Sequence, residues 1–246
     1  MGSTSECGCG GFAEYVCASE HLLVLKPAGM TFEQVAAVPV AATTALQGLR
    51  DEGQIQQGQK VLINGASGGV GTFAVQIARW FGAEVTGVCS TRNVDMVRSI
   101  GADHVIDYTQ EDFTRNGQRY DLIFDTVANH PVSDCMRALG PEGTYVACAF
   151  SPVALFLGPL ISRTGKRKVR GLNSKPNQKD LAFVKELLGA GKVVPAIDRR
   201  YTLSEVAEAL RYFEEEHARG KVVITVQHDG NDLPPPTLPL VKLVLP

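Results

Sequence analysis

A glycine-rich stretch in the first third of the chain has the residue types and spacing of a phosphate-binding turn. Residues 64–71 read Asn-Gly-Ala-Ser-Gly-Gly-Val-Gly, and they follow the apolar, β-branched run Val61–Ile63. From Val70 to Phe81 apolar residues recur every three or four positions, which predicts a helix packed on a sheet. Because the first N–H groups of a helix have no partner within it, a strand, a glycine turn and a helix in this order can bind an anion.

The turn departs from the strict dinucleotide-binding fingerprint G-x-G-x-x-G. When the fingerprint is aligned on Gly68 and Gly71, Ala66 stands at its first glycine position. The context still favours nucleotide binding, because the strand candidate Glu84–Cys89 follows about 20 residues later, as such units require. A purely structural glycine turn is the alternative.

The end of this second strand indicates which dinucleotide would bind. An Asp or Glu there would hold the ribose 2′-hydroxyl of NAD, but Ser90, Thr91 and Arg92 follow Cys89 instead. Arg92 offers a planar fork for a phosphate, and the serine and threonine offer hydroxyl groups. The residues therefore favour NADPH. The alternative is that Arg92 faces solvent while Ser90 and Thr91 cap a helix.

Strand and helix candidates alternate regularly after Lys60, which predicts an α/β protein with a doubly wound parallel sheet. The strand candidates are Val61–Asn64, Glu84–Cys89, His104–Asp107, Leu122–Val127, Gly143–Ala149 and Val169–Leu172. The helix candidates are Val70–Phe81, Asn93–Ile100, Pro131–Leu139 and Pro152–Ser162.

Both ends of the chain break this alternation. Before Lys60 we predict strands at Gly11–Ala18 and Leu22–Leu25. We also predict two helices there, Phe32–Val38 and Ala41–Arg50, which Pro39 separates. After Ser174 the pattern predicts a helix at Lys179–Gly189, a strand at Val193–Pro195, a helix at Glu205–His217 capped by Ser204, and a strand at Val222–Val226. Residues 228–246 contain a run of prolines and are predicted to be extended or disordered.

Composition narrows the class of protein. The net charge is −2 over 246 residues, which gives no sign of a nucleic-acid partner. The six cysteines are scattered without a C-x-x-C pair, so we expect reduced thiols, a cytoplasmic location and no metal site. No apolar run is long enough to span a membrane, and no signal peptide is visible.

Several motifs in order give the chain a family resemblance. They are GFAEYVCA, AAVPVAATTALQGL, NGASGGVG, VTGVCSTRN, SIGADHVIDY and HARGKVVITV. Between about Gly10 and Val226 the chain resembles the zinc-independent quinone oxidoreductase branch of the medium-chain dehydrogenase/reductase superfamily. The resemblance implies an NADPH-binding Rossmann domain at 36–174, including a linker helix, and a GroES-like β domain built from both chain ends. Only remnants of that catalytic domain are expected here, at 1–35 and 175–227, followed by the tail 228–246.

The resemblance also implies which residues bind the cofactor. The pyrophosphate would lie on the turn, at Ser67, Gly68, Gly69, Val70 and Gly71. The 2′-phosphate would lie near Ser90, Arg92 and Tyr108, and the nicotinamide side near Thr44, Val127 and Ala128. His217, Ala218, Arg219 and Lys221 would line the cleft. Structural alternatives exist: Tyr108 could simply end a strand, Thr44 could hydrogen-bond within its own helix, and Arg219 could be a surface charge.

The family implies an NADPH-dependent oxidoreductase that transfers a hydride to a quinone, an enone or a related small carbonyl substrate, without zinc. The sequence identifies no proton donor, so the catalytic residues are unknown. Relatives often dimerise through an edge of the cofactor domain, where Val169–Leu172 would lie. The alternatives are a non-catalytic NADPH-binding module, a truncated scaffold protein, or an ordinary enzyme whose synthesis starts further upstream.

Overall fold

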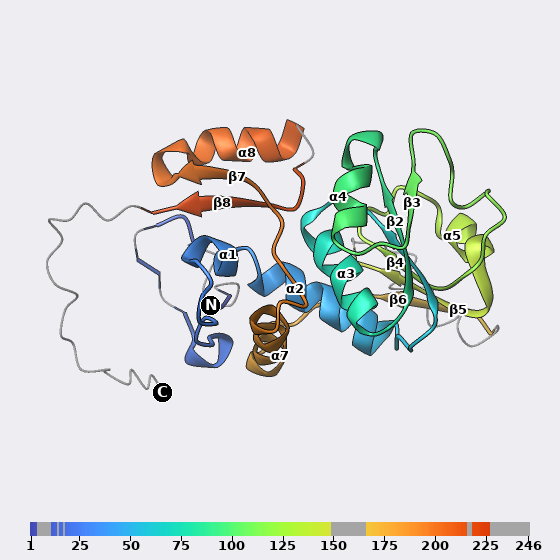
Figure 1. Cartoon of the computed structure of the whole chain (residues 1–246), viewed down its shortest axis with the longest axis horizontal. Coiled ribbons are helices and arrows are strands. Elements are labelled where there is room, and N and C mark those ends of the chain that lie inside the picture. The colour runs from blue at the N-terminus through green and yellow to red at the C-terminus, as the bar shows by residue number, and fades with distance from the viewer. Residues whose placement is uncertain (4–10, 14, 17, 149–165, 216–217, 227–246) are drawn as a thin grey trace, which may run out of the picture.

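The computed structural model describes residues 1–3, 11–13, 15–16, 18–148, 166–215 and 218–226. A six-stranded sheet with its helices forms one end of the molecule, and a two-stranded sheet with one helix lies near the N-terminal segment at the other end (Figure 1). Helices α2 (Pro39–Gln47) and α7 (Gln178–Gly189) lie between these two parts (Figure 1). The predicted helix Pro152–Ser162 and the tail 228–246 lie outside the described residues.

The large sheet has the strand order β3-β2-β1-β4-β5-β6, and every neighbouring pair is parallel. This order confirms the predicted doubly wound α/β fold. Asn64 at the end of β1 pairs with Val88 and with Asp125, so the carboxyl ends of β1, β2 and β4 are level. The strands are β1 (Lys60–Asn64), β2 (Glu84–Cys89), β3 (His104–Asp107), β4 (Tyr120–Asp125), β5 (Leu139–Ala147) and β6 (Lys168–Gly171).

Alternating side chains of these strands form two cores, one on each face of the sheet. Val61 and Ile63 of β1 belong to the core that includes α3 (Gly69–Trp80) and α2. Leu62, between them, belongs to the core beneath α5 (Val132–Ala138). Because successive strand residues point to opposite faces, burial of all three explains the continuous apolar run.

Two other helices pack on the face that carries α3. Helix α4 (Val94–Ser99) lies close to β2, where Gly87 leaves room for Val97. Helix α3 is followed by Gly82 at a φ of 78°, a left-handed conformation that is common just after the end of a helix. Helix α2 (Pro39–Gln47) begins at Pro39 and continues into a π-helical turn, Gly48–Glu52. A proline at the first helical position explains why this residue separates α2 from α1 (Phe32–Ala36).

The C-terminal part has a helix α7 (Gln178–Gly189) and a parallel pair, β7 (Ile197–Thr202) and β8 (Lys221–Thr225), connected through α8 (Val206–Glu215). The prediction of a strand at Val193–Pro195 is wrong. There the side-chain amide of Gln76 donates to the Val194 carbonyl at 2.9 Å and accepts from its N–H at 2.8 Å. Because Gln76 occupies both backbone groups of Val194 and Pro195 has no N–H, this segment cannot pair with a neighbouring strand.

The predicted cap of the last helix is displaced by two residues. Thr202 and Glu205 form a capping box in front of the short turn Leu203–Glu205, so the N-cap is Thr202 and not Ser204. Glu205 accepts from the Thr202 N–H at 2.8 Å. A threonine three positions before a glutamate therefore marked the N-cap better than Ser204, the serine nearest the apolar face of the helix.

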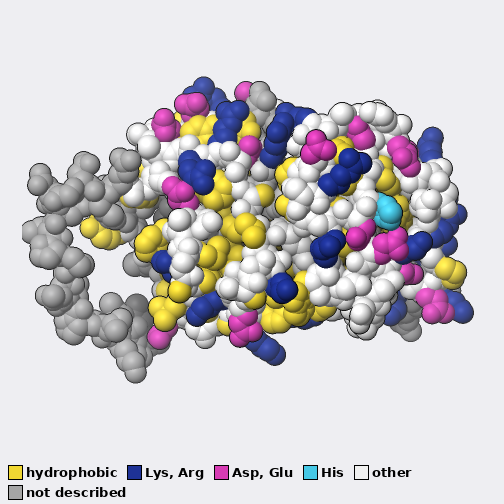
Figure 2. Space-filling view, in the orientation of Figure 1, with side chains coloured by type: hydrophobic (Ala, Val, Ile, Leu, Met, Phe, Trp, Pro, Cys, Tyr) yellow, Lys and Arg dark blue, Asp and Glu magenta, His cyan; other side chains and the backbone are white. Residues whose placement is uncertain are grey.

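The N-terminal strands predicted at Gly11–Ala18 and Leu22–Leu25 are not formed in the described residues. A single turn of 3₁₀ helix occupies Glu20–Leu22, and Gly2 and Leu23 form one isolated antiparallel bridge. Figure 2 shows hydrophobic side chains gathered over the part of the molecule with α1 and the N-terminal segment. Exposed large hydrophobic side chains of the N-terminal segment and α1 include Phe12, Tyr15, Leu25 and Phe32, at 58–83%. Among the described helices, none is long and apolar enough to cross a membrane.

Candidate functional site

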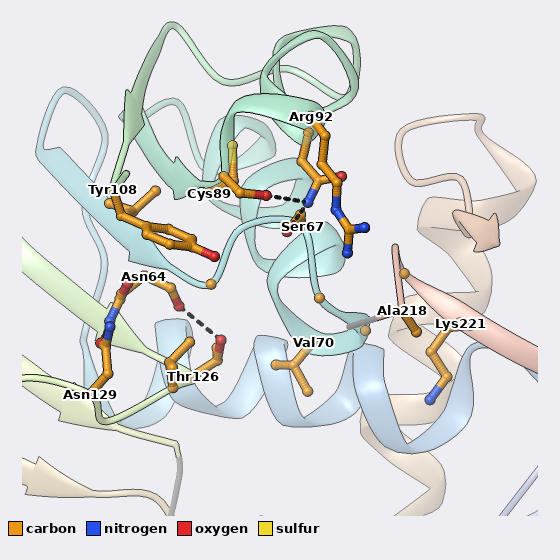
Figure 3. A pocket seen from close by; sticks show the side chains of 18 of the residues that line it. Asn64, Ser67, Val70, Cys89, Arg92, Tyr108, Thr126, Asn129, Ala218 and Lys221 are labelled. Carbon is orange, nitrogen blue, oxygen red and sulfur yellow. Dashed lines mark hydrogen bonds between the residues drawn. The ribbon is translucent and has the colours of Figure 1, made fainter. Parts of the chain in front are cut away.

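A cleft of about 1130 Å³ opens where β1, β2 and β4 end and where the chain enters β8 (Figure 3). Its position agrees with the rule that open α/β sheets bind ligands outside the carboxyl ends of their strands. Predicted residues that line it are Ser67, Gly68, Gly69, Val70, Ser90, Arg92, Tyr108, Val127, Ala218 and Lys221.

The glycine turn has its shape because its backbone packs on itself. Gly65 has a φ of 82°, and a Cβ on Gly71 would collide with the Gly65 carbonyl group. Gly71 is therefore a packing residue and does not line the cleft. Ala66, which replaces the first glycine of the fingerprint, is fully buried, and its N–H donates to the Val88 carbonyl at 2.9 Å. Gly87 on β2 faces the Ala66 methyl group and makes room for it, which explains how the turn accepts an alanine.

The chain segment before β8 closes onto this turn. The Gly220 N–H donates to the Ser67 carbonyl at 2.8 Å, and Gly68 and Gly220 form an isolated parallel bridge. This bond holds Lys221 beside the start of α3: a Cβ on Gly69 would lie 3.0 Å from Lys221 Cδ and 3.6 Å from its Nζ. A lysine at a helix N-terminus adds a positive charge to unpaired N–H groups.

Lys221 is a partly buried ammonium. Burial lowers its pKa from the ordinary value of 10.5, because desolvation disfavours the charged form. Within the described part of the chain its Nζ has no hydrogen-bond or ion-pair partner. A charge held in this way beside a helix N-terminus suits an anionic ligand that would restore the lost solvation.

The β2 side of the cleft carries hydroxyl groups and one arginine. Asn93 donates from Nδ2 to the hydroxyl oxygens of Ser67, at 3.2 Å, and Ser90, at 3.1 Å. Arg92 extends from this side into the opening above the turn, and Tyr108 lies across from it (Figure 3). No acidic residue ends β2, as the sequence indicates. The lining therefore offers donors and positive charge where a ribose phosphate would lie.

At the end of β4 a buried carboxylate shapes the opposite wall. Asp125 Oδ1 accepts from the backbone N–H groups of Val127, at 3.0 Å, and Ala128, at 2.9 Å, and from Asn64 Nδ2 at 2.9 Å. Its Oδ2 accepts from the Tyr145 hydroxyl at 2.9 Å. These bonds stabilise a turn in which Ala128 has a φ of 56°. The turn presents Val127 to the cleft, whereas Ala128, predicted beside it, does not line the cleft.

Sequence reasoning missed the polar residues of this wall, Asn64, Asp125 and Asn129. Asn64 also donates to Asn129 Oδ1 at 3.0 Å, and both asparagines line the cleft. A signal was present, because Asn64 and Asp125 each follow a buried apolar run at the edge where ligands bind.

Two cysteines also line the cleft, Cys89 from β2 and Cys148 after β5. Burial raises the pKa of each thiol to about 11. Both are therefore protonated at neutral pH, and neither has the lowered pKa of an activated nucleophile. Within the described residues, no three His, Cys, Asp or Glu side chains gather as metal ligands would.

The structure places some predicted residues away from the cleft. Thr44 lies in a second cavity of about 170 Å³, where its hydroxyl donates to Ser174 Oγ at 3.1 Å. Arg219 is exposed, and its backbone N–H donates to Asp198 at 2.9 Å. His217 lies outside the described residues.

Comparisons with known proteins agree with the fold. A family model described as zinc-binding dehydrogenase matches residues 100–224. A chloroplast envelope quinone oxidoreductase homolog from Arabidopsis thaliana is 33% identical over 89% of this chain and 70% of the plant protein. A chloroplastic NADPH-dependent alkenal/one oxidoreductase from the same plant is 34% identical over 87% of this chain, which spans only 53% of that relative. The structure of the quinone oxidoreductase from Coxiella burnetii has a TM-score of 0.79 and 32% identity over 87% of this chain and 67% of that one.

The parallel sheet, the glycine turn and the cleft at the strand ends define an α/β fold of the kind that binds dinucleotides. The similarity to these relatives shows that the chain belongs to the quinone oxidoreductase-like branch of the medium-chain dehydrogenase/reductase superfamily.

Proposed function

We propose that the cleft binds NADPH and that the chain takes part in transfer of a hydride from NADPH to a quinone, an enone or a related carbonyl, without zinc. The observation that carries this proposal is the anion cradle, in which the glycine turn, the start of α3 and the Lys221 ammonium converge. The names of the relatives, quinone oxidoreductase and alkenal/one oxidoreductase, support the substrate class.

Each wall of the cleft would hold one part of the cofactor. The turn at 67–70 and Lys221 would bind the pyrophosphate through backbone N–H groups and charge. Ser90, Arg92 and Tyr108 would surround the 2′-phosphate. The turn after β4, held by Asp125, would lie beside the nicotinamide ribose with Val127. NADPH would supply the hydride, while the protein orients both reactants and limits access of water.

The choice between NADPH and NADH can be tested at Arg92. In Arg92→Ala we expect NADPH affinity to fall about tenfold or more, because a charge-assisted phosphate contact is lost, while NADH affinity changes little. Arg98→Ala is the matched control, since Arg98 is an exposed arginine of the neighbouring helix, paired with Asp95. The measurement is titration of both cofactors by nicotinamide fluorescence. Equal losses for NADPH and NADH would remove the 2′-phosphate role.

A non-catalytic NADPH-binding module or truncated scaffold is the second candidate function. The chain spans 53% and 70% of the lengths of these two relatives. Turnover with 1,4-benzoquinone and a short enone separates the two candidates in a preparation that binds NADPH. Oxidation of NADPH supports the enzyme, and tight binding without oxidation supports the module.

We also propose that residues 1–35 and 175–227 form one GroES-like unit beside the cofactor domain 36–174. Arg200 and Glu33, from the two pieces, form an ion pair at 2.6 Å. Gln178 donates to the Leu23 carbonyl at 2.9 Å, which joins the same pieces again. Limited proteolysis that releases 36–174 as a stable fragment, with the other two pieces retained together, would support this division.

Dimerisation and location are further proposals. Within the described residues β6 is the last strand of the sheet on its side, so its outer edge can pair with a second copy of the chain. Sedimentation of the purified protein tests this. Both plant relatives are named as chloroplast proteins, so fractionation of the source cells is the direct test of the cytoplasmic location that the sequence favours.

A further inference from the structure

We propose that Asn93 is a specificity-determining positioning residue, which orients the hydroxyl groups of Ser67 and Ser90 so that both donate toward the cofactor's 2′-phosphate. This inference rests on the proposed binding of NADPH and adds the device that would distinguish NADPH from NADH. Asn93 ends the short helical turn Thr91–Asn93 and is only 4% exposed, yet it borders the cleft.

The hydrogen-bond pattern indicates that each serine hydroxyl accepts from Asn93. The amide nitrogen of Asn93 has only donors, and it lies within 3.2 Å of both hydroxyl oxygens. Each serine oxygen therefore accepts from Asn93 and keeps its own O–H proton for another acceptor. Within the described residues neither hydroxyl donates to a protein group, and both serines line the cleft. Both hydroxyl groups, which follow two different strands, are thus able to donate to a ligand in the cleft.

The other end of the amide makes no hydrogen bond of its own within the described residues. Asn93 Oδ1 is buried and has no hydrogen-bond partner in the described structure. Most buried polar atoms in proteins are paired, so an unpaired acceptor calls for an explanation. The side chain is held by its donor end alone, which is the end that contacts the two serines.

The position identifies the ligand group. Ser90 follows β2, where α/β proteins distinguish a ribose 2′-hydroxyl from a 2′-phosphate, and Arg92 brings positive charge to the same wall. A phosphate has only acceptor oxygens at neutral pH and gains from every aligned hydroxyl donor. An aspartate at position 93 would accept both serine protons, turn them away from the cleft and add a negative charge. The difference between amide and carboxylate at this residue should therefore select the cofactor.

The test compares Asn93→Asp and Asn93→Ala with the wild-type chain, using NADPH and NADH as separate ligands. Gln118→Glu is the matched control, because it makes the same amide-to-acid change at an exposed side chain before β4. In N93D we expect NADPH affinity to fall more than about tenfold while NADH affinity changes less than about threefold. N93A should give a smaller loss of the same selectivity, and Q118E none.

A second set of variants keeps the inference testable if N93D does not fold. The double variant S67A/S90A keeps Asn93 but removes both hydroxyl groups, and it should show the same selective loss of NADPH. The triple variant S67A/S90A/N93A should lose little more NADPH affinity than S67A/S90A. The effects of substitutions at residues that act through one another are not additive.

Two kinds of failure are distinguishable. If the wild-type chain binds neither nucleotide, the proposed function is wrong and this inference fails with it. If wild type prefers NADPH but N93D, or S67A/S90A, loses affinity for both cofactors equally, or keeps the wild-type ratio, then Asn93 does not set specificity while NADPH binding stands.

Discussion

At the scale of single residues, Lys221 would couple the proposed cofactor binding to pH. Its pKa in the folded chain is below the value of 10.5 that it has when exposed, because burial penalises the ammonium. Below the lowered pKa this penalty destabilises the folded chain, and the destabilisation is relieved as pH rises toward 10.5. A bound pyrophosphate needs the protonated form, so binding and pH are linked through this group.

We predict that NADPH affinity of the wild-type chain falls as pH rises through the lowered pKa of Lys221, in a window below 10.5. Lys221→Gln should reduce affinity by about tenfold at neutral pH, because a charged contact is lost, and should remove that pH dependence. Lys221→Arg keeps the charge, since arginine stays protonated, and its affinity should stay level over the same window. Titrations between pH 7 and 10 provide the measurement. A wild-type curve that is as flat as that of K221R would contradict the role.

A substitution at Gly69 tests the anion cradle by filling space, without a change of charge. A Cβ there would lie 3.0 Å from Lys221 Cδ and 3.3 Å from the Gly220 carbonyl oxygen, so Gly69→Val must displace the lysine and the segment before β8. We predict a loss of NADPH affinity of at least about tenfold with little change in thermal stability. Gly189→Ala is the control, because a Cβ at the end of α7 meets nothing within 4 Å. Undiminished affinity in G69V would count against the site.

At the scale of elements, a buried carboxylate ties α7 to α2. Asp180 is 4% exposed; it forms an ion pair with Arg50 at 2.8 Å and accepts from Gln47 at 2.7 Å. Although burial favours the neutral acid, the hydrogen bonds from Arg50, Asn177 and Gln47 outweigh that effect and hold the pKa of Asp180 below its ordinary value. Its stabilising contribution is therefore present above pH 3.8 and is lost as pH falls through the lowered pKa.

We predict that Asp180→Ala lowers the free energy of unfolding at pH 7 by about 2–3 kcal/mol, because Gln47 and Arg50 lose a buried partner. Asp95→Ala is the matched control: Asp95 also pairs with an arginine, Arg98, but is fully exposed, so no measurable change is expected. Urea denaturation followed by circular dichroism gives both values. If the two variants have equal stability, the contacts of Asp180 do not hold α7 in place.

The same elements show what sequence could predict. Strands β1 to β3 were placed to within a residue, because buried β-branched runs and helical stripes are local signals. Strand β7 was misplaced because its apolar signal is weak: only Ile197 and Tyr201 are large and apolar in Ile197–Thr202. The side-chain bonds of Gln76 to Val194, which exclude a strand there, join residues 118 positions apart and leave no local pattern.

At the scale of the whole molecule, the cleft depends on contacts that span most of the chain. The turn at 64–71 was predictable, and the resemblance implied that Ala218 and Lys221 line the cleft, but nothing in the sequence predicted the Gly220–Ser67 bond that closes the turn. The role of Asn93 was not predictable, because it depends on where two serines from different strand ends meet. Thr44 was assigned to the same cleft by resemblance, whereas the structure places it against Ser174 in the neighbouring cavity.

The distribution of apolar surface gives a last prediction for the 246-residue chain. Leu25 is 83% exposed and Phe32 is 79% exposed, and Tyr15 nearby in sequence is 73% exposed. Large exposed apolar patches promote association, so we expect the chain to self-associate with rising concentration and to bind a hydrophobic dye. The double variant Leu25→Ser/Phe32→Ser should reduce both effects without changing NADPH affinity, since neither residue lines the cleft. Val194→Ser is the control, an exposed apolar side chain elsewhere in the chain, at 55%. Sedimentation velocity over a concentration series gives the result. If L25S/F32S associates as strongly as wild type while V194S does not, the contact surface lies away from the N-terminal segment.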